Sequence, residues 1–129
     1  MAEPVPPTDP PVIRVIAMPA DTNPAGDIFG GWLMSWMDLA AGTVAARRSH
    51  GRAATVAMDG LDFIRPVLVG DEVSFYATLV SEGRSSMKIH VEAWRRAREV
   101  EDTEKVTEAT ITYVSIGADR RPLPLPPKL

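Results

Sequence analysis

The alternation of hydrophobic and polar positions is the first feature of this chain that predicts structure. In residues 85–94, Met87, Ile89 and Val91 alternate with Lys, His and Glu, which is the pattern of a strand with one face in the core. Four other segments are rich in β-branched and aromatic residues and also favour strands. They are residues 12–18, 54–63, 72–80 and 105–116.

One segment has a different composition and predicts a helix. Residues 32–51 are rich in Leu, Met and Ala, and they are long enough for about four to five turns of about 3.6 residues each. The helix begins near Gly30 and Gly31, and Arg47 lies in the last turn, where the helix dipole favours positive charge. Gly51 is expected to adopt the left-handed conformation that ends many helices. Because apolar residues occur almost all the way round, we expect this helix to be enclosed.

The order of these segments predicts the fold class. One strand precedes the helix and four strands follow it, with turn-rich segments at residues 65–71 and 81–85. A single buried helix needs a sheet wide enough to cover it, and about five curved antiparallel strands satisfy this need. The predicted class is therefore α+β, in one domain over residues 12–120. Residues 1–11 and 121–129 are rich in proline, which predicts flexible or polyproline-like segments.

The composition narrows the chemistry. At 129 residues and 45% hydrophobic content, the chain is long enough for one packed domain and too short for two. A net charge of −3 argues against a nucleic-acid-binding surface. The lack of cysteine excludes disulfides, thiol nucleophiles and thiolate metal sites. The acidic N-terminus does not resemble a signal peptide, and no apolar run approaches about 18 residues, so we expect the cytoplasm.

Asp38 is the strongest candidate for catalysis. It is the only charged residue between Ile28 and Ala46, and it lies in the middle of the predicted helix. A carboxylate in apolar surroundings is unfavourable unless it is paired, hydrogen-bonded or protonated. Such surroundings make a carboxylate a stronger base, which is common at catalytic sites. The alternative is that Asp38 reaches solvent or pairs with a cation such as Arg65.

The loop before the helix is the second candidate. Asn23 offers both a donor and an acceptor, and Gly30 and Gly31 open the helix without side chains that would block its first N–H groups. These amides can stabilise a developing oxyanion and allow a substrate carbonyl to come close. Asp27 is expected to hold the loop or cap the helix. The alternative is a plain Asx turn followed by a glycine-rich helix entry.

A basic group lies near the 81–85 turn. Arg84, Ser85, Ser86 and Lys88 occur close together there, and Arg52 follows the predicted helix. Guanidinium, hydroxyl and backbone amide groups are suited to binding phosphate. The alternative is a charged, solvated hairpin.

Other chemistries are not supported by the sequence. The two histidines, His50 and His90, have no metal-ligand spacing and no convincing Ser-His-Asp arrangement around them. No P-loop or dinucleotide fingerprint occurs. We therefore expect neither a metal nor a cofactor.

Three stretches resemble a known family. They are NPAGDIFGGWLMSWMD, TVAMDGLDFIRPVLVGDEV and GRSSMKIHVEAW, and they are similar, in order, to the YciA-like bacterial acyl-CoA thioesterases. The resemblance runs from about residue 12 to about residue 123. It implies a hotdog fold, in which a curved antiparallel sheet wraps one long helix. It also implies a homodimer with one continuous sheet, and further assembly into a hexamer, as a trimer of dimers.

The same resemblance assigns roles to residues. It implies that Asp38 is the catalytic carboxylate and that Asn23 faces it across the dimer interface. The Gly31 N–H would donate to the thioester oxygen, and Gly30 beside it would contact the substrate. The coenzyme A nucleotide would lie along Arg84, Ser85, Ser86 and Lys88. Arg52 and Arg65 are weaker candidates for the same contact.

The expected reaction is hydrolysis of acyl-CoA to a carboxylic or fatty acid and coenzyme A. Asp38 acts either as general base for a water or as direct nucleophile, and the sequence does not separate these mechanisms. Trp36 departs from the family, where Gln is frequent, and either reshapes the substrate passage or packs against the sheet. One rival is a hotdog dehydratase, which would need a histidine near the Asn23–Asp38 stretch. Another is a non-catalytic acyl-CoA sensor, which would not need a buried carboxylate.

Overall fold

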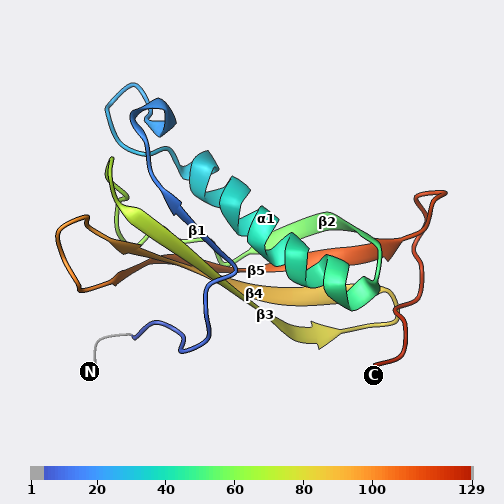
Figure 1. Ribbon diagram of the computed structural model, residues 1–129. Coiled ribbons are helices and arrows are strands. Elements are labelled where there is room, and N and C mark those ends of the chain that lie inside the picture. The colour runs from blue at the N-terminus through green and yellow to red at the C-terminus, as the bar shows by residue number, and fades with distance from the viewer. Residues whose placement is uncertain (1–4, 129) are drawn as a thin grey trace.

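The computed structural model describes residues 5–128 and shows one long helix lying across one face of a curved sheet (Figure 1). The helix is α1 (Gly30–Ser49), and a short 3-10 helix, η1 (Pro19–Asp21), precedes it. The strands are β1 (Ile13–Ile16), β2 (Arg52–Asp59), β3 (Glu72–Glu82), β4 (Ser86–Arg96) and β5 (Glu104–Ile116).

The five strands form a single antiparallel sheet in the order β1-β3-β4-β5-β2. The strand after the helix, β2, therefore lies at one edge, and the first strand, β1, lies at the other. This arrangement confirms the predicted α+β class with one helix and five antiparallel strands. The predicted strand 54–63 ends earlier, at Asp59, because the chain turns at Gly60 with a φ of 77°, a conformation that glycine adopts without strain.

The face of the sheet that meets α1 carries the core. Met87, Ile89, Val91 and Ala93 of β4 are fully buried, while their polar neighbours lie on the opposite face, which confirms the predicted alternation. From the helix, Leu33, Met37 and several alanines complete this core. Alanine has a small side chain, so α1 can lie close to the sheet.

The prediction that the helix is enclosed on all sides is wrong for the single chain. The sheet covers one side of α1, and two large apolar residues on the other side stay exposed, Met34 at 39% and Leu39 at 58%. All five strands lie on one side of this 20-residue helix (Figure 1). Trp36 packs partly buried against the core and contacts Trp32 edge to face, with ring centroids 6.3 Å apart.

The helix ends one residue earlier than predicted. His50, not Gly51, adopts the left-handed conformation, with φ 56° and ψ 32°, and its N–H donates to the Ala46 carbonyl. Histidine is one of the non-glycine residues found in this region more often than average. Gly51 N also donates to Ala46 O, at 3.3 Å, so two N–H groups share this carbonyl where the chain leaves the helix.

The proline-rich ends behave differently from one another. Residues 5–11 form no helix or strand, and residues 1–4 of the predicted lead lie outside the described residues. The C-terminal segment, which its prolines predict to be flexible or polyproline-like, is held along the sheet. Leu123 N donates to Ser115 O and Leu125 N to Arg84 O, both at 2.8 Å, and Arg48 donates to Pro126 O at 2.7 Å. None of the helices in residues 5–128 has the length and hydropathy needed to span a membrane.

Candidate active site

Asp38 lies in the middle of α1, half-buried, and its carboxylate accepts two hydrogen bonds from the sheet. The Tyr113 hydroxyl lies 2.6 Å from Oδ1, and Thr55 Oγ1 lies 2.8 Å from the same oxygen. The Tyr113 hydroxyl is also 2.8 Å from the main-chain oxygen of Asp38. No hydrogen bond from residues 5–128 reaches Oδ2, so this oxygen remains available to a substrate or water.

The two donors come from adjacent strands. Thr55 of β2 and Tyr113 of β5 are directly opposite each other in the sheet register, so their side chains share the face that meets α1. The register then shifts, because Ala57 pairs with Thr112 and leaves Val56 as an extra residue. Such bulges bend a strand and redirect its side chains, and they are frequent beside active sites.

Tyr113 is held as a hydrogen-bond donor. Its side chain is 2% exposed, and burial raises the pKa of the Tyr113 phenol well above its ordinary value. The hydrogen bond to Asp38 and the charge of that carboxylate raise this pKa further. The phenol therefore stays protonated and donates. Pairing of Asp38 with Arg65, the alternative that the sequence left open, does not occur.

Asn23 organises the loop before α1. Its side-chain oxygen accepts hydrogen bonds from Ala25 N at 2.9 Å and Asp27 N at 3.1 Å, and its own N–H donates to Asp27 O at 2.7 Å. This is the Asx turn that the sequence offered as the structural alternative. Its amide nitrogen Nδ2 donates to no residue among 5–128. Asp27 holds the loop through its backbone and does not cap the helix, whose N-cap is Phe29.

The first amides of α1 are free to meet a ligand. Gly30 and Gly31 open the helix as predicted, and neither N–H donates to a residue in the described part of the chain. Asp38 lies eight residues beyond Gly30, which corresponds to about 12 Å along a helix axis. In one chain these amides therefore lie about two helical turns from the Asp38 position. The predicted site residues occupy two separate places, with Asn23, Gly30 and Gly31 at the start of the helix and Asp38 near its middle.

A pocket of about 370 Å³ lies beside the start of the helix. Phe63 forms part of its wall and packs over Gly30, where an added Cβ would lie 3.1 Å from the ring. The lining is mostly apolar, which suits a hydrocarbon group. It consists of Ile28, Gly30, Leu33, Phe63, Ile64, Arg65, Pro66 and Val67.

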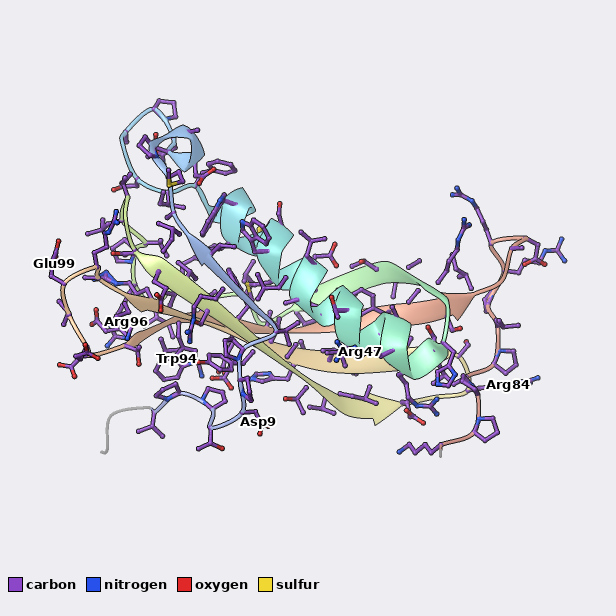
Figure 2. The ribbon with its side chains drawn as sticks, in the orientation of Figure 1. Asp9, Arg47, Arg84, Trp94, Arg96 and Glu99 are labelled. Atoms are coloured by element: carbon purple, nitrogen blue, oxygen red, sulfur yellow. The ribbon has the colours of Figure 1, made fainter. Side chains whose placement is uncertain are left out.

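The structure gathers most of the predicted basic group at the opposite end of the molecule, near the C-terminus of α1. Ser86 of β4 pairs with Val114, and Arg52 of β2 pairs with Ile116, so both lie beside the end of β5. Arg84 is exposed in the turn between β3 and β4 and lies toward the same end as Arg47 in Figure 2.

The rest of this group is close by. Ser85 O accepts a hydrogen bond from Ser115 N at 2.8 Å, and Lys88 is exposed two residues into β4 on the outer face. Arg84 and Ser85 line a pocket of about 250 Å³ with Pro122 and Pro124 of the C-terminal segment. Arg65 is not part of this group. It pairs with Glu104 at 3.0 Å and donates to Lys105 O at 3.0 Å, near the start of β5.

A separate polar cluster lies on the outer face of the sheet. His90 Nε2 lies 3.4 Å from a Glu92 oxygen and 3.2 Å from a Glu108 oxygen, a spacing at which three ligand atoms could meet a metal ion. Lys105 Nζ lies 2.5 Å from Glu108 and 3.7 Å from Glu92. This ammonium offsets one of the two carboxylate charges and would repel a cation at the same place. The cluster lies on the face away from α1, so His90 cannot assist Asp38.

Sequence reasoning missed two residues of the site, Thr55 and Tyr113. A signal existed for Tyr113, because its alternation with Ile111 and Ala109 in β5 places it on the core face. A buried tyrosine there needs a hydrogen-bond partner for its hydroxyl. Thr55 had no such signal, since threonine is common in strands and its direction depends on the bulge.

Comparison with known proteins gives consistent matches. The model of the thioesterase superfamily matches residues 25–101. An uncharacterized acyl-CoA thioester hydrolase of Zymomonas mobilis is 55% identical over 126 residues, covering 98% of this chain and 85% of that protein. The acyl-CoA thioester hydrolase YciA of Salmonella typhimurium is 47% identical over 118 residues and 89% of each protein. The crystal structure of a hexameric thioesterase from Yersinia pestis matches with a TM-score of 0.89 and 43% identity, covering 95% of this chain and 99% of that one.

Proposed function

The chain belongs to the thioesterase superfamily, and from this premise we propose that it is an acyl-CoA thioesterase with the hotdog fold. The observation that carries the proposal is the half-buried Asp38 carboxylate, whose Oδ1 is held by two hydroxyl groups while Oδ2 is available. The relatives of this chain described above are named acyl-CoA thioester hydrolases. A carboxylate can catalyse this hydrolysis without a histidine, because the coenzyme A thiolate leaves readily.

The proposed reaction adds water to the thioester carbonyl. Asp38 takes a proton from the water as its oxygen attacks the carbonyl carbon, and the C–S bond then breaks. The coenzyme A thiolate leaves and acquires a proton, and the carboxylic acid is released. The Gly31 N–H would stabilise the oxyanion, and the free amide of Asn23 would orient the water or the carbonyl. Direct attack by Asp38 would form an anhydride instead, and water would then hydrolyse it.

A second copy of the chain would complete the site. Gly31 lies seven residues, or about two helical turns and about 10 Å along the axis, from Asp38, and Asn23 lies in the loop before the helix. The edge strand β2 carries Thr55 and has one free edge, and Leu39 on the adjacent helix is 58% exposed. Pairing β2 with its counterpart in another subunit would extend the sheet and cover this apolar surface. The hexameric relative from Yersinia pestis supports homo-oligomerisation, here as a trimer of such dimers.

The apolar pocket and the basic group suit the acyl end and the coenzyme A end of the substrate, respectively. The apolar pocket that Phe63 lines beside Gly30 would take the acyl group, since it adjoins the proposed oxyanion donor. The hairpin cations and hydroxyls, from Arg84 to Lys88 with Arg52, would meet the phosphates of coenzyme A. Arg65 lines the acyl pocket rather than this basic region. The proposal needs no metal or cofactor and places the protein in the cytoplasm.

The rival functions fit the geometry less well. A dehydratase needs a histidine at the reacting carbon, but His50 lies at the end of α1 and His90 on the outer face of the sheet. A sensor needs no organised carboxylate, whereas three elements cooperate to hold Asp38. A sensor would bind acyl-CoA without releasing thiol.

The test is the release of free thiol from acyl-CoAs of short to long chain by wild type and by Asp38→Asn. We expect turnover by wild type and a fall of about 10²- to 10⁴-fold in kcat for the variant, with coenzyme A binding kept. Asp9→Asn, a change of the same type in the exposed N-terminal segment, is the matched control. A folded wild-type protein that binds acyl-CoA and releases no thiol would favour the sensor.

A further inference from the structure

We propose that Tyr113 and Thr55 are positioning residues, which hold Oδ1 of Asp38 so that Oδ2 faces the attacking water or the thioester carbon. This inference rests on the proposed thioesterase function. Both hydroxyls bond to the same carboxylate oxygen, Tyr113 at 2.6 Å and Thr55 at 2.8 Å. Two donors that approach one oxygen from different strands fix the rotation of the carboxylate, which a single hydrogen bond does not.

The Tyr113 hydroxyl has more hydrogen-bond acceptors beside it than its burial requires. A buried phenol needs one acceptor, and the main-chain oxygen of Asp38 already lies 2.8 Å from it. Thr55 is exposed and could give its hydroxyl to water. Its hydroxyl instead donates to the oxygen that Tyr113 contacts. The pair therefore serves the carboxylate rather than its own burial.

The backbone is shaped to place this pair. Thr55 and Tyr113 are opposite each other immediately before the bulge at Val56, and a strand without that extra residue would continue with a different register. On the helix, Gly42 follows Asp38 by one turn and lies beside Tyr113, where an added Cβ would be 3.8 Å from the hydroxyl, an ordinary van der Waals distance. The ring of Tyr113 therefore packs directly against this turn of α1.

The chemical consequence concerns the orientation of the carboxylate. Orientation affects kcat rather than substrate affinity, because the reacting geometry exists only when the water and carbonyl are aligned. A purely structural role would instead lower thermal stability and leave kcat of the folded enzyme unchanged.

The experiment measures kcat and KM for wild type, Tyr113→Phe and Thr55→Val. We expect kcat of Tyr113→Phe to fall about tenfold to about a hundredfold with little change in KM. Thr55→Val should lower kcat in the same way, again with little change in KM, and Thr55→Ser should restore wild-type behaviour.

Tyr76→Phe is the matched control, because Tyr76 is the other tyrosine of the chain and lies on the outer face of β3. It should leave kcat and KM unchanged. Wild-type kinetics in both folded variants would overturn the positioning role while leaving the thioesterase function intact. Should circular dichroism show that Tyr113→Phe is unfolded, kcat and KM of Thr55→Val and Thr55→Ser decide. A folded wild type without turnover would overturn the thioesterase function itself, and the positioning role with it.

Discussion

At the scale of single residues, the Asn23 side chain carries two polar groups with different surroundings. Its oxygen holds the loop through Ala25 N and Asp27 N, while its amide nitrogen stays free within the described residues. The structural role and the proposed catalytic role therefore belong to different atoms of one side chain. A substitution that changes only one of these atoms can separate the two roles.

Asn23→Asp makes this separation. The new carboxylate keeps an acceptor for the loop amides and removes the N–H donors, so we expect the melting temperature to change little. We expect kcat to fall about 10²-fold, as for loss of one oxyanion or substrate donor. Asn23→Ala removes both roles and should lower the melting temperature as well. Full kcat in folded Asn23→Asp would show that Asn23 acts only in the loop.

At the scale of elements, the two faces of the sheet serve different purposes. The inner face of β4 and β5 is apolar and packs against α1, while the outer face carries His90, Glu92, Lys105 and Glu108 in mutual contact. Side chains alternate along each strand, so one pair of strands supports both the core and a charged surface. The outer cluster adds a pH-dependent contribution to stability that is independent of the candidate active site.

The Lys105–Glu108 pair sets the sign of this dependence. The hydrogen bond from Lys105 lowers the pKa of Glu108 from its usual 4.5, so the unfolded chain takes up the proton more readily than the folded one. The stabilisation is therefore fully present above about pH 4.5 and is lost as the pH falls through the folded pKa. Because Glu108 is 44% exposed, screening limits the effect to no more than about 1 kcal/mol.

Urea unfolding of wild type and Glu108→Gln at a series of acid pH values checks this. The free energy of unfolding of wild type should fall more steeply with decreasing pH than that of Glu108→Gln. Glu99→Gln, at an exposed position in the turn after β4, should follow the wild-type curve. Parallel curves for wild type and Glu108→Gln would contradict the assignment.

At the scale of the whole molecule, the single chain leaves surfaces that a second copy could cover. Among residues 5–128 no strand pairs with the outer edge of β2, and apolar residues on the free side of α1 are exposed, among them Met34 and Leu39. The loop amides and the carboxylate lie too far apart in one copy to meet one thioester. In a two-fold dimer each subunit would give its loop to one site and its carboxylate to the other.

Mixing two inactive variants tests this arrangement. Subunits with Asn23→Asp and subunits with Asp38→Asn are each expected to form inactive dimers. After unfolding and refolding together, half of the dimers should be mixed, and each mixed dimer would hold one intact site of two. The mixture should therefore regain about a quarter of wild-type kcat. No recovery in mixed oligomers, verified by mass, would place both residues in one subunit's site.

The sequence by itself determined the fold class, the approximate strands and helix, and the identity of Asp38 and Asn23 as candidates. These features follow from local patterns, because burial imposes a period on hydrophobic residues and an isolated carboxylate in an apolar helix stands out. Only the tertiary structure decided what Asp38 contacts. Its partners lie 17 and 75 residues away in sequence, and their meeting depends on a strand register and a bulge that no local pattern encodes. For the same reason Arg65 pairs with Glu104 instead of joining the hairpin cations.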